Sequence, residues 1–313
     1  MPCHRLFSGF LALLLPAFAW PAISPAAVSG RDSVVSFTLA RNKVLVPVRV
    51  NGSRPLRLIL DTGMGFDGVL LFDPSLKDSI GPARLSSAKI PGAGAGPPSD
   101  AVFADSLSLQ VGDTRINNQR IIILSDSSMV SRRSDGVIGW SLLGRYAVEI
   151  DYDRLAITLH DARSFRPAAG WTSLPLSLND RNLPFLEVSA AADSEALHPL
   201  KVYIDYASSE TIEILTKPGM EFPVPARTTE VLLGRGLSGD IRGRRGTISR
   251  LVIGPHELKD VVAAFVPAKT RSKAKGADAV LSNGALCRFD VVFDYAHSRL
   301  HIRPNGHLPA VLD

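Results

Sequence analysis

The chain has 313 residues, of which 45% are hydrophobic and 21% are charged. This length and composition allow a sizeable core in one large or two moderate domains, and they exclude a disordered type of chain. The formal net charge is +5, but the basic residues are dispersed apart from two stretches, Arg242–Arg245 and Lys269–Lys275. Neither stretch has interleaved aromatic residues, so we interpret both as solvated loops and expect no nucleic-acid partner.

Residues 1–27 have the pattern of a secretory signal peptide. Arg5 precedes an apolar run from Leu6 to Trp20, and Ala17-Phe18-Ala19 offers a cleavage site between small residues. We therefore expect a secreted or periplasmic protein. The alternative is an uncleaved N-terminal anchor, which is the only membrane association expected, although the apolar run is short for a membrane span.

The chain after this segment is a series of short runs rich in β-branched residues and separated by turn residues. In chain order they include LVPVRVNG from Leu45, RIIIL from Arg120, AVEIDYD from Ala147, PFLEVSAA from Pro184 and DVVFDY from Asp290. A brief helix is possible near Trp140 to Leu143, and no long amphipathic helix is expected. The pattern predicts an all-β or nearly all-β fold.

Several sequence landmarks occur twice at a nearly constant spacing. DGVIGWSLLGRYAVEIDYDRLAI from Asp135 matches DAVLSNGALCRFDVVFDYAHSRLHI, which begins 143 residues later at Asp278. The same spacing carries Asp61 to within one residue of Asp205, and both aspartates end an apolar run. The chain is therefore predicted to contain two copies of one unit. We place them at residues 33–160 and 181–305, joined by a Pro- and Gly-containing linker at residues 161–180.

Asp61 follows three apolar residues and precedes Thr62 and Gly63. Alone, this tripeptide also fits an ordinary strand-to-turn transition in which the aspartate accepts backbone hydrogen bonds. Two carboxylates about 3 Å apart can activate a water molecule for peptide hydrolysis, because they share one proton. A duplicated unit delivers such a pair, so the repeat nominates Asp205 as the partner of Asp61.

The tripeptide Asp61-Thr62-Gly63, followed by Val137-Ile138-Gly139, resembles the two halves of an aspartic-protease lobe. The duplicated organisation resembles bacterial retropepsin-like aspartyl proteases with two lobes in one chain. The resemblance implies a mostly β fold of two similar six-stranded-type barrel lobes related by pseudo-twofold symmetry. It also implies an aspartic endopeptidase that acts on extended peptides or unfolded proteins without a cofactor or a metal.

The resemblance implies roles for the residues around the two aspartates. Thr62 would hydrogen-bond across the lobes, and Gly63 would offer its N–H to the carboxylate. Val137, Ile138 and Gly139 would form a strand behind the Asp61 loop. Two Gly-rich stretches would form flaps over the cleft, with ordinary exposed loops as the alternative. The flap candidates are Gly94, Gly96, Gly236 and Gly239.

The second unit departs from this motif at several positions. Tyr206 and Ala207 stand where Thr and Gly are expected, so hydrogen bonding across the lobes is expected from one side only. Ala207 requires a negative φ, and Ser208 could supply a substitute hydroxyl. Ser282 stands where the first unit has Gly139. These departures keep open an alternative function, a periplasmic peptide-binding protein without catalysis.

Other site chemistry has little support in the sequence. His297 and His301 match a strand, a turn and a strand rather than a helix, so a metal site is not expected. Cys287 has no partner once Cys3 leaves with the signal peptide, and we expect a buried, inert thiol. Pairing of two Asp61 residues from two chains is disfavoured, because each first lobe already has an internal partner.

Overall fold

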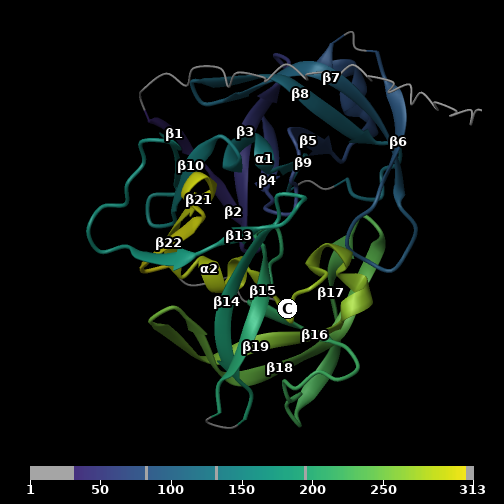
Figure 1. Ribbon diagram of the computed structural model, residues 1–313. Helices are drawn as coiled ribbons and strands as arrows, with labels where there is room; N and C mark the ends of the chain where they lie inside the picture. The colour runs from purple at the N-terminus through teal and green to yellow at the C-terminus, as the bar shows by residue number, and fades with distance from the viewer. Residues whose placement is uncertain (1–31, 82–83, 131–132, 194–195, 308–313) are drawn as a thin grey trace, which may run out of the picture. The chain divides into compact units, whose positions relative to one another are not determined.

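The computed structural model describes residues 32–81, 84–130, 133–193 and 196–307 (Figure 1). The signal-peptide prediction for residues 1–27 lies outside the described residues. Within the described ranges no helix is both long and apolar enough to cross a membrane. The secondary structure is dominated by strands that form three sheets, so the prediction of a mostly β fold is confirmed.

The first eight-stranded sheet is built from the first half of the chain. Its spatial order is β2 (Thr38–Ala40), β3 (Lys43–Val50), β4 (Leu56–Leu60), β9 (Gly136–Ile138), β5 (Gly68–Leu71), β8 (Thr114–Leu124), β7 (Ser99–Val111) and β6 (Ser86–Ile90). An additional pairing of β3 with β7 closes six of these strands into a ring. The first half therefore contains a closed six-stranded barrel.

The second eight-stranded sheet is built from the second half and has the same pairing order. It runs β13 (Ser177–Leu178), β14 (Pro184–Ala191), β15 (His198–Asp205), β20 (Ala279–Ser282), β16 (Ile212–Thr216), β19 (His256–Pro267), β18 (Gly239–Ile253) and β17 (Thr228–Gly236). The pairing of β14 with β18 again closes a ring of six strands. The expected six-stranded-type barrels are thus present in both halves.

A third sheet of six strands combines both halves of the chain. Its order is β1 (Ser33–Ser36), β11 (Ala156–Asp161), β10 (Tyr146–Asp151), β21 (Phe289–Asp294), β22 (Arg299–Pro304) and β12 (Thr172–Pro175). The junction is the antiparallel pairing of β10 with β21, in which Val148 faces Phe293. Two of the strands named above, β12 and β13, fall within the stretch that we predicted as a linker.

The helices in the described part of the chain are short and connect strands. They are η1 (Pro74–Ile80), α1 (Trp140–Leu143), η2 (Ala268–Thr270), η3 (Ser272–Ala274), α2 (Asn283–Leu286) and η4 (Tyr295–His297). The short helix expected near Trp140 is α1. α1 follows β9 and α2 follows β20, the strands that pair with the strands leading to the two aspartates. The two helices therefore occupy equivalent positions in the two halves.

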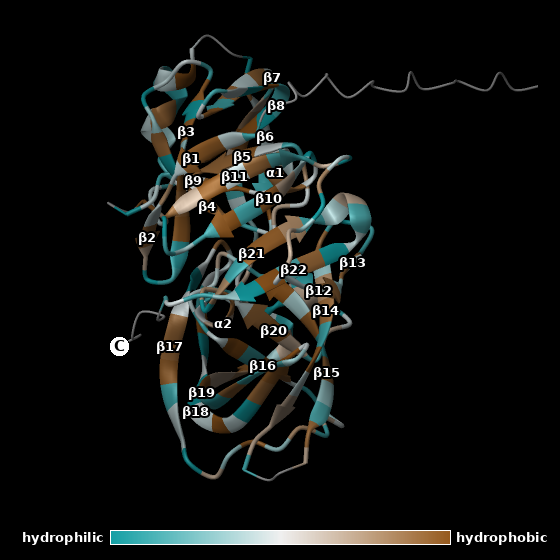
Figure 2. Cartoon of the chain, turned by 90° about the vertical axis from the view of Figure 1, so that its left-hand side faces the viewer, coloured by the Kyte–Doolittle hydropathy of each residue, from teal (hydrophilic) through white to brown (hydrophobic). Residues whose placement is uncertain are grey.

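Apolar residues are concentrated on the strands, as Figure 2 shows in brown. One cluster of buried residues includes Leu60 and Val148 from the first half and Ile204 and Phe293 from the second. Every residue of β21 is buried, which agrees with its central place in the sheet shared by the halves. The core therefore supports both aspartate loops from beneath.

Asp135 and Asp278 make equivalent hydrogen bonds in their respective halves. Asp135 Oδ2 accepts from the backbone N–H of Arg57 at 2.8 Å, and Asp278 Oδ2 accepts from that of Lys201 at 3.1 Å. The backbone N–H of each aspartate donates to the carbonyl of the same partner, at 2.9 and 2.8 Å. These contacts pin the strand behind each aspartate loop to the strand that leads into it.

Candidate active site

Asp61 lies directly after β4, where the parallel neighbour β9 also ends. Its backbone N–H donates to the carbonyl of Ile138 at 2.8 Å. Its carboxylate oxygen Oδ1 accepts from the N–H of Gly63 at 2.7 Å. The buried strand end and the turn that follows therefore hold the carboxylate in a defined direction.

Asp205 occupies the corresponding place in the second half. It is the last residue of β15 and pairs in register with Ser282 of β20. Its Oδ1 accepts from the N–H of Ala207 at 3.2 Å, which repeats the contact between Asp61 and Gly63. Ala207 is not among the described residues with a positive φ, so its methyl group is accommodated.

Thr62 joins the two aspartate loops. Its hydroxyl Oγ1 donates to the carbonyl of Ile204 at 2.7 Å and accepts from the N–H of Tyr206 at 3.0 Å. The side chain is only 2% exposed, so both bonds are shielded from water. The loop of the second half contributes only main-chain groups to these two bonds, so the side-chain hydroxyl comes from Thr62 and has no counterpart at Tyr206.

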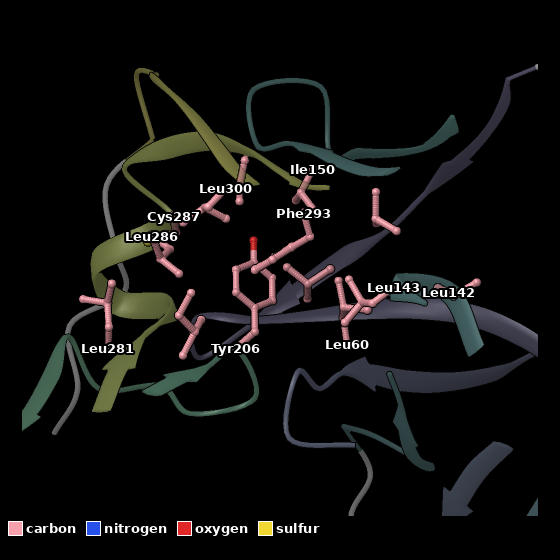
Figure 3. Packing of buried hydrophobic residues seen from close by; sticks show 14 of the residues in the cluster. Leu60, Leu142, Leu143, Ile150, Tyr206, Leu281, Leu286, Cys287, Phe293 and Leu300 are labelled. Carbon is pink, nitrogen blue, oxygen red and sulfur yellow. The ribbon is translucent and has the colours of Figure 1, made fainter. Parts of the chain in front are cut away.

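The side chain of Tyr206 turns away from the aspartates into the core between the halves. Figure 3 shows its ring among buried apolar residues, including Leu60, Leu286 and Phe293. The ring packs edge-on against Phe293, and its hydroxyl contacts the hydroxyl of Tyr152. Tyr206 thus exchanges the hydrogen bond of a threonine for packing in the core.

Gly139 and Ser282 mark a second difference between the halves. A methyl group on Gly139 would overlap the carbonyl oxygen of Asp61 and lie 2.6 Å from that of Met64, so only glycine fits there. Ser282 is fully buried at the corresponding point, and its hydroxyl has no hydrogen-bond partner among the described residues. The Asp205 loop therefore leaves room for a side chain that the Asp61 loop excludes.

Ser208 does not supply a substitute hydroxyl across the halves. Its Oγ donates instead to Oε1 of Glu213 at 3.0 Å. Glu213 is fully buried and accepts two hydrogen bonds from the guanidinium of Arg271, one of them from Nε at 2.7 Å. Arg271 also places its Nη1 3.6 Å from Oδ2 of Asp205. A buried charged network thus stands behind the second aspartate.

Lys273 lies beside the first aspartate loop. Its Nζ donates to the carbonyl of Gly63 at 2.7 Å, although Lys273 belongs to η3 of the second half. The interpretation of Lys269–Lys275 as a solvated loop is therefore wrong for Arg271 and Lys273. The missed signal is Glu213, a charged residue within the apolar run of β16, because a buried carboxylate requires a basic partner.

The site contains several buried ionisable side chains, and burial shifts their pKa values. Burial raises the pKa of Asp61, and the neighbouring Asp205 carboxylate adds to this effect while Lys273 opposes it. Burial lowers the pKa of Lys43, the first residue of β3, against the opposing attraction of both aspartates. Burial also raises the pKa of Tyr203 well above its ordinary value. Asp61 is therefore the group whose protonated form the surroundings favour.

The two Gly-rich hairpins meet each other. Their contacting parts are residues 91–98, between β6 and β7, and the two-residue turn Leu237–Ser238, between β17 and β18. Gly96 N–H donates to the carbonyl of Ser238 at 2.7 Å, and Ser238 N–H donates to the carbonyl of Ala93 at 2.9 Å. The flap candidates Gly94, Gly96, Gly236 and Gly239 are thus brought together at one place.

The hairpin contact lies next to the segment that carries Arg271. Gly94 N–H donates to the carbonyl of Thr270 at 3.1 Å. Leu237 packs against the same apolar cluster as Ala207, a cluster that also contains Met64. The hairpin tips, the basic segment and both aspartate loops therefore form one connected region.

The remaining candidates lie away from this region or take part in other contacts. His297 Nδ1 lies 2.8 Å from Oδ2 of Asp294, and His301 Nε2 lies 3.4 Å from the same oxygen. No cluster that could hold a metal ion occurs among the residues that the structure describes. Cys287 is a buried free thiol, and burial raises its pKa to about 12, which fits the expected inert role.

Comparison with known proteins agrees with this architecture. Residues 46–142 match the family model for aspartyl proteases, and a search of curated proteins gives no match. Among solved structures, the chain is similar to the aspartic proteinase from Irpex lacteus, with a TM-score of 0.54 and 14% identity. The similarity covers 88% of this chain and 98% of the other.

The family match within the first half and the fold of the chain agree with a resemblance to pepsin/retropepsin-like aspartyl proteases. The resemblance inferred from the sequence is thereby confirmed. The family match includes Asp61, Thr62 and Gly63 and extends through the strand Val137–Ile138 to Gly139. The structural similarity, which spans most of the chain, extends the aspartic-proteinase fold to the second half.

Proposed function

We propose that the chain is an aspartic endopeptidase that hydrolyses peptide bonds with a water molecule activated between Asp61 and Asp205. The observation that carries the proposal is the equivalent placement of the two carboxylates. Each follows or ends a strand, accepts the N–H two residues later and belongs to a loop held by Thr62. The family and the fold support peptidase activity in general.

The proposed division of labour follows from the surroundings of the two carboxyl groups. Burial raises the pKa of Asp61, so Asp61 carries the shared proton and donates a hydrogen bond to the carbonyl oxygen of the substrate. Asp205 then accepts the proton of the attacking water. Because the pair titrates as a unit, activity is present below the raised pKa and is lost as pH rises through it.

Peptide cleavage by single-residue variants tests the proposal. Asp61→Asn and Asp205→Asn are each expected to abolish cleavage of a denatured, alkylated protein across the acid to neutral range. Asp105→Asn is the matched control, because Asp105 is exposed and pairs with Arg120 rather than with the aspartate loops. Full activity of Asp205→Asn would exclude the pairing of the two aspartates.

A second candidate function is peptide binding without turnover. Arg271 at 3.6 Å from Asp205 and the hairpin tips bonded to each other favour it, because both features oppose entry of water and substrate. Under this alternative the wild type binds extended peptides and releases them uncut at every pH. The products of a long incubation, separated by mass, decide between the two functions.

We further propose that the protein is secreted or periplasmic and that residues 33–160 and 181–305 are its two lobes. The first statement rests on the sequence pattern of residues 1–27. The second is supported by the identical pairing order of the two eight-stranded sheets and the equivalent contacts of Asp135 and Asp278. N-terminal sequencing of the mature protein tests the location: a start between Trp20 and Val28 is expected, whereas a start at Met1 contradicts cleavage.

A further inference from the structure

The two halves hold their aspartates in different ways. In the first half, the Gly63 N–H lies 2.7 Å from the carboxylate and Thr62 anchors the loop. In the second half, the corresponding N–H lies 3.2 Å away, and the side chain of Tyr206 leaves the site. The loop around Asp205 therefore needs another source of support if the two carboxylates are to keep matching positions.

A basic segment of the second half lies against both loops. We call residues 268–274 the clamp segment; it comprises η2, Arg271 and η3, and it connects β19 to β20. Arg271 is only 9% exposed and faces Asp205. Lys273 reaches across to the carbonyl of Gly63. One short segment thus places a cation on the loop of each aspartate.

The buried partner of Arg271 has no equivalent in the first half. In the second sheet Glu213 pairs with Val280, and in the first sheet Leu70 pairs with Val137 at the same point of the register. Leu70 lies in an apolar cluster, so the barrel does not require a charge at this position. A buried carboxylate is costly unless it is paired, and Arg271 and Ser208 supply that pairing.

The chain of contacts leads from this ion pair to the site. Glu213 fixes the guanidinium through two hydrogen bonds, and the same guanidinium presents Nη1 to Asp205. Ser208, three residues after Asp205, is held by the same glutamate. The loop that lacks Thr and Gly is therefore anchored by the Arg271–Glu213 ion pair in addition to its bonds with Thr62.

We propose that the clamp segment positions the two aspartates: Arg271, held by Glu213, orients Asp205, and Lys273 holds the Asp61 loop from the second half. The clamp segment takes the place of the hydrogen bond across the lobes that a threonine at the position of Tyr206 would make. Arg271 and Lys273 are positioning residues, because they act on substrate only through the two carboxylates. The inference rests on the proposed function of the aspartate pair.

Kinetic constants of clamp variants test the proposal. Lys273→Met is expected to lower kcat by about 10- to 100-fold with little change in KM, because a small displacement of a reacting group has effects of this order. Lys273→Arg is expected to retain activity, since its guanidinium can also donate to the Gly63 carbonyl. Lys269→Met is the control, because this lysine lies in the same segment but is exposed.

Arg271 requires a double variant, since its removal alone leaves Glu213 buried without its partner. Arg271→Met combined with Glu213→Leu removes both charges. It also places a leucine at position 213, as the first half has at the equivalent residue Leu70. Replacement of a buried ion pair by apolar residues is often tolerated by a fold. The double variant is expected to unfold near the wild-type temperature and to lose kcat to a similar extent as Lys273→Met.

Hydrogen exchange gives a readout that does not depend on activity. The amides of Gly63 and Ala207 donate to the two carboxylates, so faster exchange is expected at Gly63 in Lys273→Met and at Ala207 in the double variant. Unchanged exchange together with unchanged kcat in these variants overturns the proposal. A rise in kcat also overturns it, because it shows that the segment blocks the site instead of positioning the aspartates. If the wild type cleaves nothing, the proposed function fails, while the exchange result still decides the clamp.

Discussion

Tyr206 shows how one residue can leave a motif while its backbone stays in it. The N–H of Tyr206 donates to Thr62 as the N–H of any residue at this position can. Its ring, by contrast, fills the core between the halves and contacts Tyr152, which also donates to Asn283. Compared with Thr62, Tyr206 therefore provides no hydroxyl to the site, and its aromatic side chain packs between the halves instead.

Removal of the Thr62 hydroxyl is predicted to weaken both the fold and the site. Thr62→Val keeps the shape but deprives the Ile204 carbonyl and the Tyr206 N–H of a buried partner. The expected loss is about 1–3 kcal/mol in the free energy of unfolding, with reduced peptide cleavage. Urea denaturation measures the loss. Thr62→Ser retains the hydroxyl, and an equal loss in this variant would contradict the role of the hydrogen bonds.

The sequence was sufficient to nominate the aspartates but not their surroundings. Asp61 and Asp205 could be found because each ends an apolar run at a repeated spacing. Arg271 was missed because its partner Glu213 is distant in sequence, and a basic residue among lysines looks like a solvated loop. The destination of the Tyr206 ring was likewise not predictable, because the receiving space is lined by residues from both halves.

At the scale of elements, the hairpins depend on close backbone approach. Gly94 has a φ of +114° and lies against the backbone of Ser238, so a side chain at this position is both strained and obstructed. In chemical terms, the paired N–H and carbonyl groups of the hairpins form a small sheet-like contact between the halves. The same groups would be available to an extended peptide once the hairpins separate.

Substitution of Gly94 by alanine is predicted to loosen the hairpin contact. The left-handed backbone and the overlap with Ser238 are expected to cost about 1–3 kcal/mol locally. Hydrogen exchange at the amides of Gly96 and Ser238 is expected to become faster. Gly234→Ala is the matched control, since a methyl group there meets nothing within 4 Å, and similar acceleration in this variant would refute the explanation.

Strand identity was predictable wherever apolar and β-branched residues cluster. The runs beginning at Leu45, Arg120 and Asp290 fall within or overlap β3, β8 and β21. The strands β12 and β13 were not predicted, because Pro and Gly nearby indicated a linker. Their pairing with β22 and β14 is set by the tertiary structure rather than by local preference.

At the scale of the whole molecule, His160 links the beginning of the described chain to the shared sheet. Its Nδ1 lies 2.9 Å from Asp32 Oδ2, and its Nε2 lies 2.8 Å from Glu149 Oε2. The three residues border a cavity of about 460 Å³ that is also lined by Phe165 and Trp171. Burial lowers the pKa of His160, but hydrogen bonding and attraction to Glu149 and Asp32 outweigh this effect and raise it.

The stability of the protein is therefore predicted to depend on His160 in a pH-dependent way. Because the folded-state pKa is raised, the contribution is fully present below the ordinary value of about 6.5 and is lost as pH rises through the folded value. His160→Gln is expected to lower the free energy of unfolding more at about pH 5 than at about pH 9. Denaturation at both pH values measures this, and an equal loss at both would contradict it.

The sheet shared by the halves has two outer edges, β1 and β12, and one inner seam, where β10 meets β21. Separation of the chain into two polypeptides would turn that seam into two open edges with unpaired N–H and carbonyl groups. Such edges are templates for pairing with another strand. Each half made alone would thus present an open strand edge that the other half, a copy of itself or another extended chain could pair with.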